Sequence, residues 1–217
     1  MESNPAALLA VAKGFNGTRD RVLTDIELFT LLDHAKDYPG LAGLAVRATV
    51  FLGGQRMAQL LRPSLTDIKD GFLVLLDPKG KRDVPRRHPI PLEGMAGVVI
   101  AEAVDRANNL KTDWLFSSTG KVRLTPDTVS KYIDDVSEEF IRSSISTTPF
   151  NLADLRRTVE TRLAGMGVSK EVRGYLQSHG LNGVQTRHYD RHGYEQEKRK
   201  ALRLLHAWIA SLGPKKS

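Results

Sequence analysis

Between residues 151 and 194 the chain gathers side chains that suit chemistry on an anionic substrate. Arg156 lies in the run Asp-Leu-Arg-Arg-Thr, His179 ends the run Leu-Gln-Ser-His, and Tyr189 follows His179 after 10 residues. Guanidinium groups bind phosphate or carboxylate oxygens in pairs, and histidine moves protons near neutral pH. A tyrosine becomes a nucleophile when nearby positive charge favours its anion, because its ordinary pKa is near 10.

Charge and composition narrow the possible classes of protein. Lys and Arg number 32 against 25 Asp and Glu, which gives a net charge of +7. This balance favours an anionic partner, with nucleic acid first and an acidic membrane surface second. The 217 residues include no cysteine, which excludes disulfides, thiolate metal sites and cysteine nucleophiles. There is no Gly-rich phosphate loop, H-E-x-x-H or Gly-x-Ser-x-Gly motif. The six histidines are scattered and no carboxylate cluster suggests a two-metal site, so metal-dependent nuclease chemistry is weakly supported.

The elements that must position these residues are mostly helical. Thr24 and Glu27 form a capping box for a helix that Pro39-Gly40 ends. Helical spacing and end signals predict further helices at residues 41–52, 95–109, 125–136, 152–166, 169–178 and 195–212. Residues 72–76 and 87–92 are predicted strands, joined through turn residues at 78–81, in a small antiparallel sheet around residues 68–92. The predicted class is therefore α+β and helix-rich.

The order of these motifs resembles the catalytic part of the tyrosine recombinases, the phage integrase family. In that family an H-x-x-R helix start is followed by an L-G-H motif and then by a nucleophilic tyrosine. Upstream, Gly54-Gln55-Arg56 is similar to the segment that holds the family's first catalytic arginine, and Lys79 matches its hairpin lysine. The resemblance spans about residues 20–212 and implies the family's mostly helical α+β catalytic domain.

The resemblance also implies a role for each residue. Tyr189 would attack the scissile phosphate, leaving a 3′-phosphotyrosyl bond and a free 5′-hydroxyl. Arg56 and Arg156 would stabilise the charge on the phosphoryl oxygens. Lys79 would protonate the leaving oxygen, and His179 would hydrogen-bond the non-bridging oxygens. Because the covalent intermediate conserves the bond energy, neither a metal nor another cofactor is expected.

Neighbouring residues offer alternatives for three of these roles. Lys81 lies two residues beyond the hairpin lysine in the same turn. Arg157 directly follows the motif arginine and could instead pair with a neighbour or contact the DNA backbone. Tyr175 and Tyr194 compete for the nucleophile, although Tyr175 is expected in the core and Tyr194 comes five residues late. Matching the motifs favours the residues named above.

Three positions depart from the family pattern. Ala153 stands where the family has the helix-start histidine, and alanine can neither transfer a proton nor orient a phosphate. Gln59 replaces the acidic residue that usually follows the first arginine by three positions. Ser178 replaces the glycine before the motif histidine. These changes predict slower or altered chemistry, with the nucleophile and both arginines retained.

The positive charge of the hairpin predicts contact with DNA. Lys81, Arg82 and Arg87, together with Arg157, are the candidate DNA-binding residues. The expected partner is double-stranded DNA with an attachment site, on which the family assembles as a tetramer, whereas this chain alone is expected to be a monomer. No apolar run approaches the length of a membrane span, and a cytoplasmic, bacterial or phage-encoded protein is expected.

Residues 1–21 are expected to be a linker from a preceding DNA-binding domain, and residues 22–217 the catalytic domain with its C-terminal helix. The expected function is site-specific recombination that integrates or excises a phage or genomic island. Two alternatives stay open. One is a degenerate member that binds DNA without cleaving it, and the other is a tyrosine-type enzyme that relaxes DNA.

Overall fold

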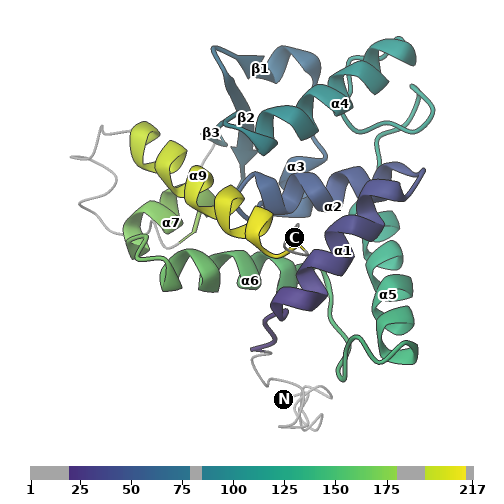
Figure 1. Ribbon diagram of the computed structural model, residues 1–217. Coiled ribbons are helices and arrows are strands. Elements are labelled where there is room, and N and C mark those ends of the chain that lie inside the picture. Colours follow the sequence, from purple (N-terminus) through teal and green to yellow (C-terminus); the bar gives the residue numbers. More distant parts are fainter. Residues whose placement is uncertain (1–19, 79–84, 180–193, 214–217) are drawn as a thin grey trace, which may run out of the picture.

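The computed structural model describes residues 20–78, 85–179 and 194–213, and it confirms the helix-rich α+β class. A short 3₁₀ helix at Leu65–Asp67 precedes a three-stranded sheet that lies beside α4 (Figure 1). The helices are α1 (Asp25–Asp37), α2 (Leu41–Phe51), α3 (Met57–Leu60), α4 (Met95–Asn109), α5 (Pro126–Arg142), α6 (Leu152–Gly165), α7 (Lys170–Gln177) and α9 (Glu195–Ser211). The strands are β1 (Ile68–Lys69), β2 (Phe72–Asp77) and β3 (Arg86–Pro91).

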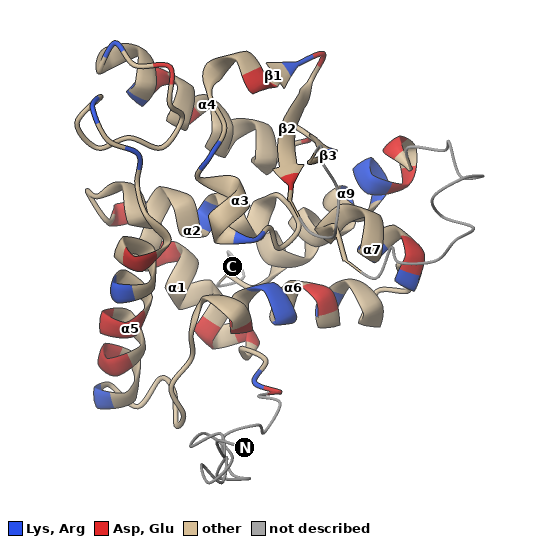
Figure 2. Cartoon of the chain, turned by 180° about the vertical axis from the view of Figure 1, so that it is seen from behind, with Lys and Arg blue, Asp and Glu red and all other residues tan. Residues whose placement is uncertain are grey.

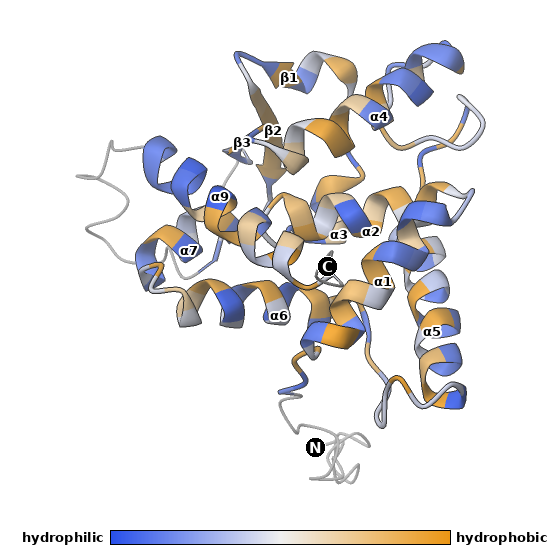
Figure 3. Ribbon diagram, in the orientation of Figure 1, coloured by the Kyte–Doolittle hydropathy of each residue, from blue (hydrophilic) through white to orange (hydrophobic). Residues whose placement is uncertain are grey.

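Helix α2 is the centre of the core. Its sequence is apolar on nearly all sides, and every residue except Arg47 is buried. It contacts α1, α4, α5, α6 and α9, and Figure 3 shows apolar colour running along it between the more polar outer helices. A helix that is apolar all round must be surrounded by other elements. The end of α2 is therefore held firmly in place by the helices packed around it.

The strands pair in the order β1-β2-β3, and both pairings are antiparallel. Leu73 on β2 faces Ile90 on β3, and both side chains are fully buried. At the other end of the hairpin Asp77 is the partner of Arg86. Of the predicted turn residues 78–81, only Pro78 is described, and residues 79–84 lie outside the described residues. The register therefore sets Asp77 and Arg86 at the base of this turn.

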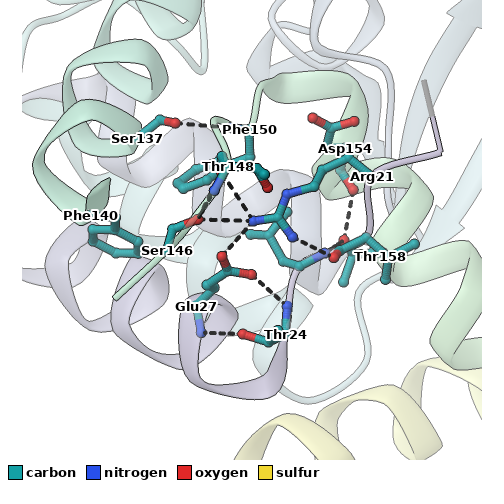
Figure 4. Close-up of polar contacts among 12 residues, drawn as sticks. Arg21, Thr24, Glu27, Ser137, Phe140, Ser146, Thr148, Phe150, Asp154 and Thr158 are labelled. Atoms are coloured by element: carbon teal, nitrogen blue, oxygen red, sulfur yellow. Dashed lines mark hydrogen bonds and ion pairs between the residues drawn. The ribbon is translucent and has the colours of Figure 1, made fainter. Parts of the chain in front are cut away.

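A group of polar side chains ties the start of α1 to the start of α6, and we call it the α1–α6 polar cluster (Figure 4). Arg21 Nη2 donates to Glu27 Oε1 at 2.5 Å and to Ser146 Oγ at 3.1 Å. The Leu23 amide donates to Thr158 Oγ1 on α6 at 2.9 Å. The predicted capping box is confirmed, because Thr24 and Glu27 exchange both hydrogen bonds. The cluster therefore holds the start of α1 against α6. Its members are Arg21, Thr24, Glu27, Ser146, Asp154, Arg157 and Thr158.

Candidate active site

A turn of two glycines brings α2, α3 and α7 together. Gly53 and Gly54 have φ values of 85° and 83°, a region that side chains disfavour. A Cβ on Gly53 would lie 2.6 Å from Leu176 Cδ2, and one on Gly54 would lie 2.5 Å from Gln177 Nε2. The pair therefore gives the chain both its sharp turn and its close approach to α7. Arg56, two residues after Gly54, is the N-cap of α3.

Arg156 joins the start of α6 to this turn. Asn151 caps α6 and forms a capping box with Asp154, which fixes the first helical turn. From the next turn Arg156 Nη1 donates to the carbonyl oxygen of Gly54 at 2.7 Å, and Nη2 donates to that of Gln177 at 2.7 Å. One guanidinium thus bridges the glycine turn and the end of α7.

Arg56 reaches the same place from the other side. Its Nη1 donates to the carbonyl oxygen of Ser178 at 2.9 Å, and the side chain is half-buried. Within the described residues neither Arg56 nor Arg156 forms an ion pair with a carboxylate. Both guanidinium groups are held by neutral carbonyl oxygens, so their charge is not neutralised by their anchors.

The two arginines are close enough to affect each other's charge. Burial and the nearby charge of Arg56 lower the pKa of Arg156 to about 10, while the carboxylates of Glu160 and Asp77 act in the opposite direction. Arg156 is still protonated at neutral pH. Two partly desolvated guanidinium groups beside one another form a local excess of positive charge that an anion would relieve.

His179 completes the described part of the site at the end of α7. Its Nε2 lies 3.3 Å from Glu160 Oε2, and the other oxygen of Glu160 accepts a 2.8 Å hydrogen bond from Arg173 Nε. Burial by itself would raise the pKa of the Glu160 carboxyl, but its bonds with His179 and Arg173 outweigh burial and leave the pKa below its usual range. Glu160 lies four residues after Arg156 on α6, so one helix face carries both.

Ser178, just before His179, is bound by a buried carboxylate. Its φ of 54° is left-handed, which is the conformation a glycine adopts freely. Its hydroxyl donates to Asp77 Oδ2 and accepts from Arg86 Nη2 at 2.5 Å. Gln59 Nε2 donates to the other oxygen of Asp77 at 2.9 Å. The hairpin, α3 and the end of α7 are thus connected through one carboxylate.

A neutral histidine, His88, contacts the last turn of α7 beside the site. His88 Nε2 lies 3.1 Å from the carbonyl oxygen of Leu176 and 3.3 Å from Gln55 Oε1. Burial, with the charges of Lys198 and Arg86, lowers the pKa of His88 to about 3, so the imidazole is neutral at pH 7. Gln55 also donates to the carbonyl oxygen of Leu176, at 2.9 Å. The last turn of α7 therefore rests on neutral hydrogen bonds.

The structure brings together three of the five predicted catalytic residues, Arg56, Arg156 and His179, at residues 177–179. Figure 2 shows basic segments where the start of α6 approaches α3. The other two, Lys79 and Tyr189, lie outside the described residues, as do Lys81 and Arg82. Their roles stay predictions.

The other candidates take distinct places. Arg157 Nη1 lies 2.5 Å from Asp154 Oδ1, which is the pairing with a neighbour left open above, and its contact with DNA stays a prediction. Arg87 is exposed on β3. Tyr175 is half-buried and stacks on Tyr194 with ring centroids 4.2 Å apart, so the expectation that it lies in the core is wrong.

The sequence motifs did not select Asp77, Arg86 or Glu160 as site residues. Glu160 carried a usable signal, because a carboxylate four residues after Arg156 shares its helix face. Asp77 carried none, since its partners Gln59 and Ser178 lie far away in the sequence. The arrangement of two guanidinium groups and an imidazole can bind the non-bridging oxygens of a phosphate and stabilise added charge there.

The phage integrase family model matches residues 21–195, which is most of the chain, and the chain belongs to this family. A search of curated proteins finds no match. Within the described residues no helix is long and apolar enough to cross a membrane, and no group of three acidic or histidine side chains is arranged to hold a metal ion.

Several solved structures share the fold. A lambda integrase dimer bound to a COC′ core site has a TM-score of 0.58 and 22% identity, over 88% of this chain and 53% of that chain. The lambda integrase catalytic core has a TM-score of 0.52 and 22% identity, over 76% of this chain and 95% of that chain. The Tn1549 transposon integrase in complex with transposon right end DNA has a TM-score of 0.63 and 15% identity, over 88% of this chain and 68% of that chain. The chain thus spans about half the length of the integrase in the dimer complex.

Proposed function

We propose that this protein is a site-specific tyrosine recombinase that integrates or excises a mobile DNA element. The observation that carries the proposal is the pair Arg56 and Arg156, both anchored on backbone carbonyl oxygens at the end of α7 beside His179. Membership of the phage integrase family and the similarity to integrases in complex with DNA support it. Double-stranded DNA that contains the attachment site is the proposed partner.

In the proposed reaction the scissile phosphate binds between the two guanidinium groups, and His179 donates a hydrogen bond to a non-bridging oxygen. The Tyr189 hydroxyl loses its proton to water and its oxygen attacks phosphorus, while the bond from phosphorus to the 5′ oxygen breaks and Lys79 gives that oxygen a proton. The products are a 3′-phosphotyrosyl bond and a free 5′-hydroxyl. Attack by a 5′-hydroxyl of another strand reverses these steps and completes the exchange.

A trapping experiment tests this proposal. Duplexes that the full-length protein selects from a random library are nicked near the selected site, so that cleavage releases a short strand and cannot reverse. The protein is incubated with them in EDTA and run on a denaturing gel. The wild type is expected to form a covalent protein–DNA band, and Tyr189→Phe is expected to form none. Tyr175→Phe is the matched control, because its ring still stacks on Tyr194.

The alternatives give different results in the same assays. Specific binding without a covalent band would contradict recombination and favour the binding-only alternative suggested by Ala153 and Gln59. Relaxation of a supercoiled plasmid that lacks the selected site would favour a relaxing enzyme. Cleavage of the nicked duplex by Tyr189→Phe would contradict the role of Tyr189 as the nucleophile.

Assembly and location belong to the same proposal. The lambda integrase structures include a dimer on a core site and a tetramer on a Holliday junction. We propose that this protein acts in the same way, as a tetramer on two duplexes in the cytoplasm, and that the chain is a monomer without DNA. Light scattering of the protein with and without the selected duplex measures both states.

A further inference from the structure

Asp77 is a buried carboxylate outside the set of residues that the sequence motifs select. The residue is 6% exposed, and it ends β2 at the base of the hairpin. Burial of a charged group is unfavourable unless hydrogen bonds and opposite charges compensate it. The residues around Asp77 provide both hydrogen bonds and a positive charge, and these residues belong to the active site.

Each oxygen of Asp77 has its own partner. Oδ1 accepts from the Gln59 amide at 2.9 Å, and Gln59 is itself 5% exposed on α3, three residues after Arg56. Oδ2 accepts from the hydroxyl of Ser178, which is 3% exposed. Arg86 Nη2 lies 3.9 Å from Oδ2. The carboxylate therefore connects the element that carries the first arginine to the residue before His179.

Ser178 is the point through which this connection reaches the catalytic groups. A left-handed conformation is unfavourable for serine, so its hydrogen bond to Asp77 helps to hold it there. The carbonyl oxygen of Ser178 accepts the hydrogen bond of Arg56, and His179 is the next residue. A shift of Ser178 would move both the first arginine and the histidine.

The charge of Asp77 acts at the same site. Its carboxylate favours the protonated form of Arg156, against the effects of burial and of Arg56. Glu160 is the other carboxylate with this effect, and it is already bonded to His179 and Arg173. Gln59 is neutral, so it cannot supply such a charge.

We propose that Asp77 is a positioning residue of the active site, which fixes Arg56 and His179 by binding the hydroxyl of Ser178. This inference rests on the proposed function for its effect on cleavage, but not for its effect on structure. Asp77 touches neither DNA nor the reacting atoms in this account. Its influence passes through Ser178, and this route can be measured in two independent ways.

The first measurement is hydrogen exchange of the protein without DNA. In Asp77→Asn the amide of His179, which donates to the carbonyl oxygen of Gly174, is expected to exchange about 10-fold faster than in the wild type. Asp70→Asn is the matched control, because Asp70 is exposed in the β1–β2 turn and asparagine accepts its left-handed φ of 51°. Unchanged exchange at residues 174–179 in Asp77→Asn would overturn the proposal, whether or not the protein cleaves DNA.

The second measurement is a double-mutant cycle on single-turnover cleavage at saturating protein. Asp77→Asn is expected to slow cleavage about 10- to 100-fold, with DNA affinity within about twofold of the wild type. Ser178→Gly removes the hydroxyl and keeps the backbone conformation, so it folds even if Asp77→Asn is destabilised. In a protein that already carries Ser178→Gly, adding Asp77→Asn is expected to slow cleavage further by less than about threefold, because Asp77 acts through Ser178.

The outcomes of the cycle separate this proposal from the proposed function. A wild type that forms no covalent adduct would contradict the recombinase function, and hydrogen exchange would still decide the role of Asp77. Additive effects of Asp77→Asn and Ser178→Gly on the cleavage rate would overturn the route through Ser178. So would a normal cleavage rate in Asp77→Asn.

Discussion

Two buried polar clusters meet α6, and they hold their arginines differently. In the α1–α6 polar cluster Arg21 lies 2.5 Å from Glu27 and Arg157 lies 2.5 Å from Asp154, so each charge has a carboxylate partner. In the active site Arg56 and Arg156 are anchored by carbonyl oxygens. The first cluster has no electrostatic need of a ligand, whereas the second carries an excess of positive charge.

The contrast gives a rule for telling structural arginines from functional ones in this molecule. A guanidinium paired with a buried carboxylate is neutralised, and removing either partner leaves a buried charge uncompensated. A guanidinium held by carbonyl oxygens keeps its full charge, and its position is fixed before an anion arrives. Substitutions in the first cluster should therefore change stability, and those in the second should change catalysis.

The largest effect is expected at Arg56. Arg56→Lys keeps the charge but loses the planar group that binds two oxygens at once, so cleavage of the nicked duplex should fall about 10²- to 10³-fold. The free energy of unfolding should stay within about 1 kcal/mol of the wild type, since a single hydrogen bond to Ser178 is lost. Quenched single-turnover kinetics and urea unfolding measure the two quantities. An Arg56→Lys protein that is much less stable but cleaves normally would instead make Arg56 a structural arginine.

Arg21→Ala should have the opposite profile. It leaves the carboxylate of Glu27, which is 3% exposed, without its cation, and the free energy of unfolding should fall by about 3 kcal/mol. Cleavage should be unchanged at temperatures where the variant is folded. Lys131→Ala on the exposed side of α5 is the control and should change neither quantity. Loss of cleavage in folded Arg21→Ala would show that this cluster also serves catalysis.

The free energy of unfolding should fall in acid because of His88, the neutral histidine that packs against the end of α7. Because burial lowers the pKa of His88 to about 3, the unfolded chain binds a proton below pH 6.5 that the folded chain does not bind. This contribution to stability therefore decreases as pH falls from about 6.5 to about 3, with a slope near 1 kcal/mol per pH unit. Urea unfolding from pH 7 to pH 4 should give a shallower slope for His88→Gln. Equal slopes for the two proteins would mean that His88 is protonated in the fold.

The smallest effect is expected at Glu160. Glu160→Gln keeps the shape but weakens the bonds to His179 and Arg173, at a cost of about 1 kcal/mol in unfolding free energy at pH 7. Because the folded-state pKa of Glu160 is lowered, its contribution is present above the usual carboxyl pKa and is lost as pH falls through the lower folded value. The wild type and variant should therefore converge in acid. A difference that persists below the folded-state pKa of Glu160 would assign the effect to packing.

Local signals predicted the elements well, because each is decided within a few residues. The Thr24–Glu27 box, Pro126 at the start of α5 and Ser169 before α7 all act over one helical turn, and the structure has each helix where they place it. Strand β3 spans Arg86–Pro91, one residue earlier at each end than predicted.

The candidate site was only partly predictable for the same physical reason. Arg56, Arg156 and His179 stand in ordered motifs, and the structure brings them together. The role of Asp77 depends on contacts with Gln59 and Ser178 across α3, β2 and α7, which no local pattern encodes. The neutral Gln59 suggested a lost charge from the sequence alone. In the fold it donates to a buried carboxylate from another element.

Peptide mapping of the trapped adduct identifies the nucleophile directly. Wild-type protein is reacted with the nicked duplex in EDTA, digested, and analysed by mass spectrometry for the nucleotide-bearing tyrosine. We expect a 3′-phosphotyrosyl bond on Tyr189, absent in Arg56→Lys at short reaction times. An adduct on Tyr175 or Tyr194, or full cleavage without any covalent adduct, would contradict this expectation.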